Sequence, residues 1–160
     1  MSIKTIFSLN LVFIFLSAGA QHFSGVYKLS DLSRRLNSED TLYVVNFWAT
    51  WCKPCVKELP SFDSLQSQQT NSNVKVLLVA LDFKEDIENK LIPFLMKHKV
   101  TSECVLLDEL NGETYISRIS KDWTGAIPAT LLKKGNQEHF IEKKLTLQEL
   151  QTHIKILNTN

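Results

Sequence analysis

Two hydrophobic patterns alternate along most of the 160-residue chain. Residues 42–48 and 74–82 are nearly continuous runs of apolar, β-branched and aromatic side chains, a pattern typical of strands buried on both faces. Elsewhere apolar residues recur every three or four positions, most clearly over residues 146–157, which is typical of a helix with one apolar face. This spacing predicts helices at residues 23–37, 52–69, 86–98, 112–119 and 146–157, and Ser30 or Asp31 is expected to cap the first.

Turn signals complete the predicted order of elements. Residues 104–107 form a short apolar run, and segments 129–133 and 138–142 flank the compact turn sequence 134–136, as in a β-hairpin. Strands that alternate with helices and then end in a hairpin and a helix predict an α/β fold. We expect a three-layer sandwich, in which a mixed central sheet is flanked by helices on both faces.

The first twenty residues differ in character from the rest. Lys4 is followed by an apolar stretch over residues 6–16 and then by small residues, with Ala18 and Ala20 at the −3 and −1 positions of a cut before Gln21. A basic start, a short apolar core and a small-residue exit are features of a secretory signal peptide. The alternative is an uncleaved membrane anchor, although the apolar stretch is shorter than the ~20 residues that span a bilayer.

We therefore expect a signal peptide at residues 1–20 and one secreted domain at residues 21–160, located in the periplasm or cell envelope. The chain carries 18 basic and 17 acidic side chains, and Lys4 is the only charged residue before Gln21, so the remainder is formally neutral. Domains that bind nucleic acid normally carry a basic excess, so this balance argues against a nucleic-acid partner.

Two of the three cysteines lie where a predicted buried strand ends and a predicted helix begins. The free N–H groups and partial positive charge of a helix N-terminus stabilise a thiolate, so Cys52 is expected to be the attacking nucleophile. Cys55 lies one turn further along, where it can resolve a mixed disulfide. Lys53 would favour the Cys52 thiolate further, unless its side chain is simply solvated.

Other roles for a CxxC pair fit the sequence less well. A zinc site needs four ligands, but there is no second CxxC and the four histidines are not at paired ligand spacing. A c-type haem site needs His after the second cysteine, where this chain has Val56. A purely structural disulfide between the two cysteines remains an alternative, although a disulfide that closes so short a loop adds little stability to the fold. Cys104, in an apolar segment, is expected to be a buried thiol, with an intermolecular or regulatory role as the alternative.

Two sequence blocks resemble a known family. One is Val-Asn-Phe-Trp-Ala-Thr-Trp-Cys-Lys-Pro-Cys at residues 45–55, followed by Glu-Leu-Pro at residues 58–60. The other is Gly-Ala-Ile-Pro-Ala-Thr at residues 125–130. Both are similar to segments of thioredoxin-fold proteins, and most similar to the extracytoplasmic TlpA/ResA-like group. With the β-α pattern between them, the resemblance covers essentially all of residues 21–160.

The resemblance implies a thioredoxin-like fold and a particular site. Pro128 is implied to be cis and to face the CxxC pair, so that the Ile127 backbone lies beside Cys52 and pairs with an extended substrate segment. Trp123 is either part of a substrate-facing rim or core. The residues expected to contact substrate are Trp51, Lys53, Pro54, Ile127 and Pro128.

Glu58 is a third candidate catalytic residue. Thioredoxin has a buried Asp in the strand before the motif, where this chain has Asn46, which cannot take a proton. The ResA-like group carries a Glu one turn after the second cysteine, and Glu58 matches it. Residues three apart share a helix face, so Glu58 is expected to reach toward the dithiol and carry the proton of the resolving Cys55 thiol. The alternative is a solvated Glu that balances Lys57.

These features predict an extracytoplasmic thiol–disulfide oxidoreductase. By resemblance it would reduce disulfides of envelope proteins, apocytochrome c being one candidate, with electrons from a membrane dithiol carrier. A disulfide-forming oxidase or isomerase, or a non-catalytic binding module, is the alternative. A peroxiredoxin-like peroxidase would need Thr three residues before its cysteine, where this chain has Ala49. We expect a monomer and no cofactor beyond a redox-active Cys52–Cys55 disulfide.

Overall fold

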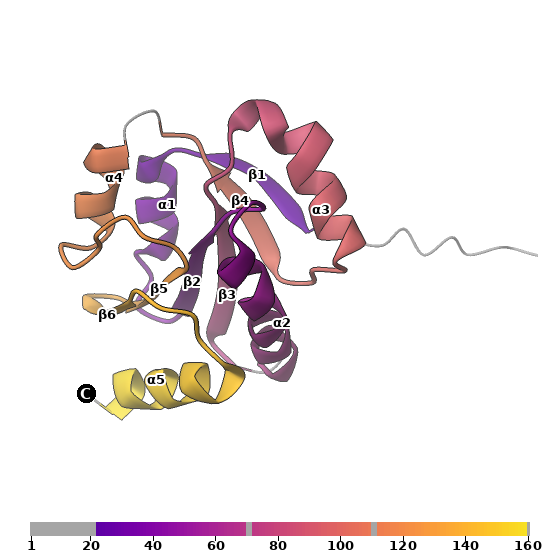
Figure 1. The fold of residues 1–160 in the computed structure, drawn as a ribbon. Helices are drawn as coiled ribbons and strands as arrows, with labels where there is room; N and C mark the ends of the chain where they lie inside the picture. Colours follow the sequence, from indigo (N-terminus) through magenta and orange to yellow (C-terminus); the bar gives the residue numbers. More distant parts are fainter. Residues whose placement is uncertain (1–21, 70–71, 110–111, 160) are drawn as a thin grey trace, which may run out of the picture.

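The protein is described by a computed structural model over residues 22–69, 72–109 and 112–159. These residues form a six-stranded sheet flanked by helices (Figure 1). The strands are β1 (Phe23–Tyr27), β2 (Leu42–Trp48), β3 (Val74–Ala80), β4 (Glu103–Leu107), β5 (Ala129–Lys134) and β6 (Gln137–Ile141). The helices are α1 (Leu29–Leu36), α2 (Lys53–Gln68), α3 (Ile92–Lys97), α4 (Gly112–Ile119) and α5 (Leu147–Thr159). The predicted signal peptide, residues 1–20, lies outside the described residues.

The sheet is mixed, with the strand order β1-β4-β3-β2-β5-β6. The first four strands in this order run parallel, and β5 and β6 run antiparallel to their neighbours. Strand β2 lies inside the sheet, pairs with β3 from Leu42↔Val74 to Trp48↔Ala80, and is buried at every residue. The mixed sheet and the strand buried on both faces are therefore confirmed.

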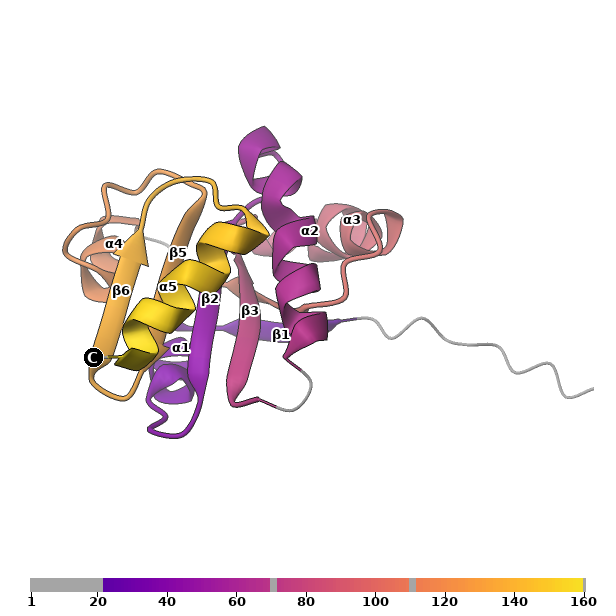
Figure 2. The same cartoon turned by 90° about the horizontal axis from the view of Figure 1, so that it is seen from below.

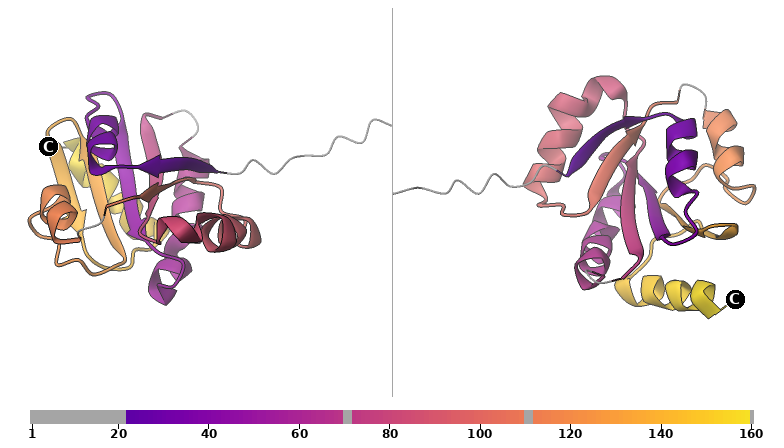
Figure 3. Two further views of the ribbon diagram at one scale, coloured as in Figure 1. Left: turned by 90° about the horizontal axis from the view of Figure 1, so that it is seen from above. Right: turned by 180° about the vertical axis from the view of Figure 1, so that it is seen from behind.

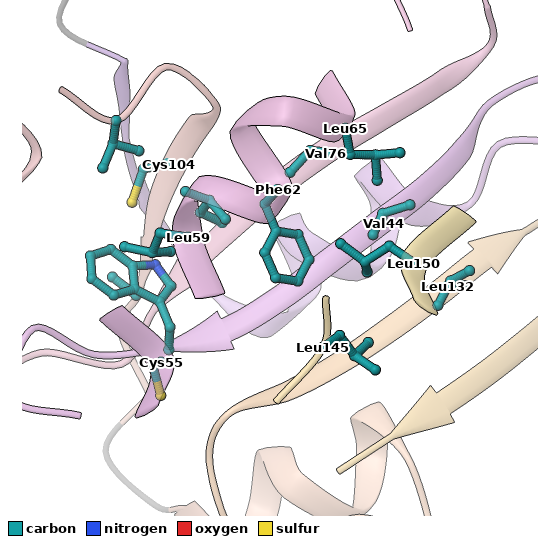
Figure 4. Close-up of a cluster of buried hydrophobic side chains, with 14 of the residues drawn as sticks. Val44, Cys55, Leu59, Phe62, Leu65, Val76, Cys104, Leu132, Leu145 and Leu150 are labelled. Carbon is teal, nitrogen blue, oxygen red and sulfur yellow. The ribbon is translucent and has the colours of Figure 1, made fainter. Parts of the chain in front are cut away.

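Each face of the sheet is covered by helices over its own apolar cluster. Helices α2, α3 and α5 pack on one face, where Figure 4 shows Phe62 of α2 and Leu150 of α5 among the buried side chains. Figure 2 shows α2 and α5 side by side over the sheet. Helices α1 and α4 cover the opposite face and lie next to each other in Figure 3. The three-layer α/β sandwich is thus confirmed.

The first predicted helix is wrong over its N-terminal third. Residues 23–27 form the edge strand β1, which pairs with β4, and the helix begins only at Leu29. Gly25 has a φ of +118°, which a right-handed helix does not allow. The predicted caps also differ: Lys28 holds the N-cap position, and the Asp31 carboxylate accepts a hydrogen bond from the Lys28 N–H at 3.1 Å.

The helix predicted over residues 86–98, which Pro93 was expected to restart or bend, is interrupted just before that proline. A 3₁₀ turn at Lys84–Asp86 and a π-helical stretch at Ile87–Leu91 precede α3. Pro93 has no N–H to bond the carbonyl four residues earlier, which accounts for the wider turn before it. The remaining predicted elements agree with the structure to within one or two residues at most of their ends.

Candidate active site

The CxxC pair lies at the carboxyl end of β2. The chain leaves the sheet at Trp48 and enters α2 with Cys52 at the N-cap position and Pro54 in the first turn. Cys52 and Cys55 are joined by a disulfide with an S–S distance of 2.01 Å. The Cys55 N–H donates a hydrogen bond to the Cys52 sulfur at 3.3 Å. A sulfur held in this way at a helix N-terminus is stabilised as a thiolate.

The two sulfurs differ in access. Cys52 keeps 6% of its surface exposed, whereas Cys55 is fully buried at 0%. The neighbouring Lys53 and Pro54 are exposed, and Trp51 is 65% exposed. An incoming sulfur therefore reaches the pair at Cys52, beside Trp51.

A second loop faces Cys52 from the β5 side. The Ile127–Pro128 peptide bond is cis, as the resemblance implied. Strand β5 pairs antiparallel with β2, with Phe47 opposite Ala129, so the start of β5 lies at the same edge as the CxxC pair. The Ile127 carbonyl oxygen lies 3.7 Å from the Cys52 sulfur. Cys52, Cys55, Ile127 and Pro128 are thus brought together from positions far apart in the sequence.

A hydrogen-bonded contact on the β3 side was missed by the sequence analysis. The Thr50 N–H donates to a carboxylate oxygen of Asp82 at 3.0 Å, and the Thr50 hydroxyl bonds the same carboxylate. Asp82 is 6% exposed and lies just beyond the end of β3. The only local signal for this contact in the sequence is an acidic residue directly after a buried strand. The hydrogen bonds between Thr50 and Asp82 hold the loop that carries Trp51 in place.

Glu58, three residues after Cys55 in α2, is buried, with 1% of its surface exposed. One carboxylate oxygen accepts from the Asn46 side-chain amide at 2.7 Å, and the other accepts from the Leu145 N–H at 2.7 Å. Burial raises the pKa of Glu58 to about 7, against the opposing effect of these two hydrogen bonds. The alternative of a solvated surface Glu is therefore wrong. Within the described residues, Asn46 Oδ1 has no hydrogen-bond partner.

Comparison with known proteins agrees with this geometry. A family model described as "AhpC/TSA family" matches residues 17–132. The chain belongs to the AhpC/TSA family.

Two relatives of this AhpC/TSA protein are named thiol-disulfide oxidoreductases. Sporulation thiol-disulfide oxidoreductase A of Bacillus subtilis is 35% identical over 109 residues, which are 59% of this chain and 66% of that protein. Thiol-disulfide oxidoreductase ResA of Bacillus thuringiensis is 44% identical over 116 residues, 69% of this chain and 60% of that protein. The chain thus matches two thirds or less of the length of these relatives.

The fold of the AhpC/TSA protein also matches solved structures. A thioredoxin-related protein from Neisseria meningitidis superposes with a TM-score of 0.67 at 23% identity, over 79% of this chain and 90% of the other. This likeness confirms the thioredoxin-like fold, and the named relatives confirm the resemblance to ResA-type proteins.

Two further predicted residues belong to the core. Trp123 is 5% exposed, donates from its indole N–H to the Ala126 carbonyl at 2.8 Å, and packs on Phe47, so it is not part of an exposed rim. Cys104 is a buried free thiol, as expected, and burial raises its pKa. Among the residues described by the structure, no three His, Cys, Asp or Glu side chains come together to hold a metal ion.

Proposed function

We propose that this protein is a thiol–disulfide oxidoreductase that exchanges electrons with protein disulfides through Cys52 and Cys55. The observation that carries the proposal is a disulfide between an N-cap cysteine and a buried partner, with the Ile127 carbonyl beside the accessible sulfur. The names of the ResA and sporulation relatives support the same activity.

Reduction of a substrate proceeds in two exchanges. In the reduced protein, the Cys52 thiolate attacks one sulfur of the substrate disulfide, an S–S bond forms between them, and the other substrate sulfur leaves as a thiolate. The Cys55 sulfur then attacks Cys52, which closes the Cys52–Cys55 disulfide and releases the second substrate thiolate. Two electrons pass to the substrate, and the leaving thiolates take up protons.

Glu58 is suited to take the proton that Cys55 must lose in the second exchange. A carboxyl group with a pKa of about 7 is poised to gain and lose a proton near neutral pH. Its position three residues after Cys55 places both side chains on one face of α2. Glu58 is therefore proposed as the proton acceptor for the buried thiol.

The location and direction of the reaction are part of the proposal. Residues 1–20 have the features of a signal peptide, which supports a role across the cytoplasmic membrane, in the periplasm or envelope. No helix in the described part of the chain is long and apolar enough to cross a bilayer. The ResA-like pattern supports reduction of envelope proteins, such as apocytochrome c, with a membrane dithiol carrier as electron donor.

Trapping of mixed disulfides tests the activity. Cys55→Ala leaves Cys52 to form a mixed disulfide that no resolving thiol releases, so we expect partners to be captured and then freed by a reducing agent. Cys52→Ala is the matched control, because it keeps one thiol but removes the accessible one, and it should capture nothing. If Cys55→Ala captures nothing under either oxidising or reducing conditions, the protein is a binding module with a structural disulfide.

The reduction potential of the Cys52/Cys55 pair tests the direction. Titration of residues 21–160 against defined thiol–disulfide ratios should give roughly −250 mV or lower, near the value of thioredoxin. A value near roughly −120 mV, as in a strong disulfide-forming oxidant, would contradict the reductive direction.

A further inference from the structure

Two histidines outside the candidate active site meet between strand β6 and helix α5. His139 Nε2 lies 3.0 Å from His153 Nδ1, and the centres of the two rings are 4.9 Å apart. Both residues are half-buried, so their rings are held by the surrounding structure without being sealed in the core. Neither histidine takes part in the chemistry proposed for Cys52 and Cys55.

The fold brings these two rings together from positions fourteen residues apart. His139 is opposite Leu132 in the antiparallel β5–β6 ladder, and opposite residues in such a ladder point to the same face of the sheet. Leu132 belongs to the apolar cluster that α5 covers, so His139 also faces α5. His153 lies three residues after the buried Leu150, on the side of α5 that contacts β6 (Figure 2).

The two facing nitrogens can both act as metal ligands. A neutral imidazole has one N–H and one free lone pair, so one nitrogen of the contact donates its proton to the other. The donating ring can instead carry that proton on its second nitrogen, because the two neutral tautomers differ only in its position. Both facing nitrogens then present lone pairs, and the imidazole of histidine is the commonest metal ligand in proteins.

The distance between the nitrogens favours one kind of coordination. At a metal–nitrogen bond length of about 2.0–2.1 Å, two nitrogens 3.0 Å apart subtend an angle of about 90° at a shared ion. This is the angle between neighbouring ligands of a square-planar or tetragonal ion, whereas a tetrahedral ion such as Zn²⁺ needs about 109° and a wider separation. Cu²⁺ and Ni²⁺ adopt tetragonal sites with nitrogen and oxygen ligands, and Cu²⁺ binds more tightly than Ni²⁺.

The charged side chains next to His153 do not oppose a bound cation. Lys143 and Glu149 both act on the charge of His153, and they form an ion pair with each other at 2.8 Å, so their charges largely cancel. The Glu149 carboxylate also accepts from the Thr146 N–H at 2.9 Å. Because Glu149 is occupied in this way, the protein would supply two ligands and water would supply the others.

We propose that His139 and His153 form a binding site for a divalent transition-metal cation, best suited to Cu²⁺, with the two imidazole nitrogens in neighbouring coordination positions. A cation bound there joins β6 to α5. It also stabilises the folded chain, because the unfolded chain does not hold the two rings together. The site is separate from the CxxC pair, and it does not depend on the proposed oxidoreductase activity.

Titration with Cu²⁺ at pH 7.5 tests the site. The oxidised protein is used without a histidine tag, so that Cys52 and Cys55 do not compete for the ion. Every sample carries His22→Ala, because His22 lies at the start of the predicted secreted domain, where a free amino group would add a second nitrogen ligand. We expect one ion per chain, and an affinity about 100-fold weaker in His139→Gln or His153→Gln, since each variant loses one of two linked ligands.

The matched control is His98→Gln, which removes an exposed histidine at the end of α3 and should leave the affinity unchanged. Electron paramagnetic resonance of the Cu²⁺ complex should show two imidazole nitrogens in the protein with His139 and His153 intact, and one in either variant. Ni²⁺ should raise the urea midpoint of the intact protein and leave that of the two variants unchanged. An affinity that is the same in His139→Gln and His153→Gln as in the intact protein, or an intact complex without two imidazole nitrogens, overturns the site.

Discussion

At the scale of single residues, Glu58 makes stability depend on pH. Burial raises its pKa from 4.5 to about 7 in the folded protein, so between these values the folded state holds a proton that the unfolded chain has released. The contribution of Glu58 to the free energy of unfolding is therefore highest below about pH 4.5. This contribution falls as the pH rises toward 7. The raised pKa corresponds to a decrease of about 3 kcal/mol in the free energy of unfolding between pH 4.5 and pH 7.

Glu58→Gln should remove this loss, because an amide does not ionise. Its oxygen can still accept from the Leu145 N–H, and its NH₂ group can donate to the unpartnered Asn46 Oδ1 once the Asn46 amide turns over. Urea unfolding of the oxidised protein should therefore show the variant gaining stability over the wild type, by up to about 3 kcal/mol, as the pH rises from 4.5 to 7.5.

The matched control for this prediction is Glu85→Gln, which changes an exposed carboxylate and should follow the wild type. A pH-independent difference between Glu58→Gln and the wild type would mean that Glu58 does not hold the extra proton.

The same variant tests the proposed proton transfer. Closure of the Cys52–Cys55 disulfide from a mixed disulfide should slow about 100-fold, the lower end of general-base contributions, and lose its pH dependence near 7.

At the scale of elements, Arg35 ties α1 to the edge of the sheet. Its guanidinium donates to both carboxylate oxygens of Glu103 in β4, and it also donates to the Tyr27 hydroxyl of β1 at 3.0 Å. The same group lies 5.8 Å from the ring centre of Tyr43 in β2. Arg35 lowers the pKa of Glu103 below its usual value, so the pair contributes stability above the unfolded-state pKa of that carboxyl group.

Arg35→Met should lower the free energy of unfolding by about 1–3 kcal/mol at pH 7, because it leaves the half-buried Glu103 carboxylate without its partner. The deficit should shrink as the pH falls below 4.5 and Glu103 is protonated. Arg34→Met, one residue earlier in α1, breaks only the exposed pair with Asp31 and should cost less than about 1 kcal/mol. Equal effects of the two substitutions would show that the Arg35 contacts do not anchor β1 and β4.

The elements differ in how well the sequence predicts them. Strand β2 and helix α2 have strong local patterns, a continuous apolar run and a capped helical start, and both were predicted closely. Strand β1 has only five residues and weak alternation, and it is a strand because β4 pairs with it. Its structure depends on a partner about eighty residues away, which no local pattern reports.

At the scale of the whole molecule, the residues of the site that lie in local motifs can be predicted, whereas contacts between distant segments cannot. Cys52 and Cys55 were predictable because the motif is local, and Pro128 because a second motif marks it. The contact of Thr50 with Asp82 joins residues 32 apart, and that of Glu58 with Leu145 joins residues 87 apart. Both depend on the register of strands and the path of loops, so they emerge only from the folded chain.

The two faces of the molecule are coupled through β2. Phe47 points to one face and packs on Trp123, with 4.8 Å between ring centres, whereas Trp48 points to the other and packs on Phe94 at 5.4 Å. Successive residues of a strand alternate between faces, so loss of β2 exposes both clusters at once. We therefore expect residues 21–160 to unfold in a single transition.

The three tryptophans allow each face to be observed separately. The double variant Trp51→Phe/Trp123→Phe leaves Trp48 as the probe of one face, and Trp51→Phe/Trp48→Phe leaves Trp123 as the probe of the other. In each variant, the urea midpoint by fluorescence should coincide with that by far-ultraviolet circular dichroism, because the local probe and the whole fold report the same event. A fluorescence midpoint at lower urea than the circular dichroism midpoint in either variant would show that one face of the sheet unfolds alone. Strand β2 would then not couple the apolar cluster around Trp48 to the cluster around Trp123.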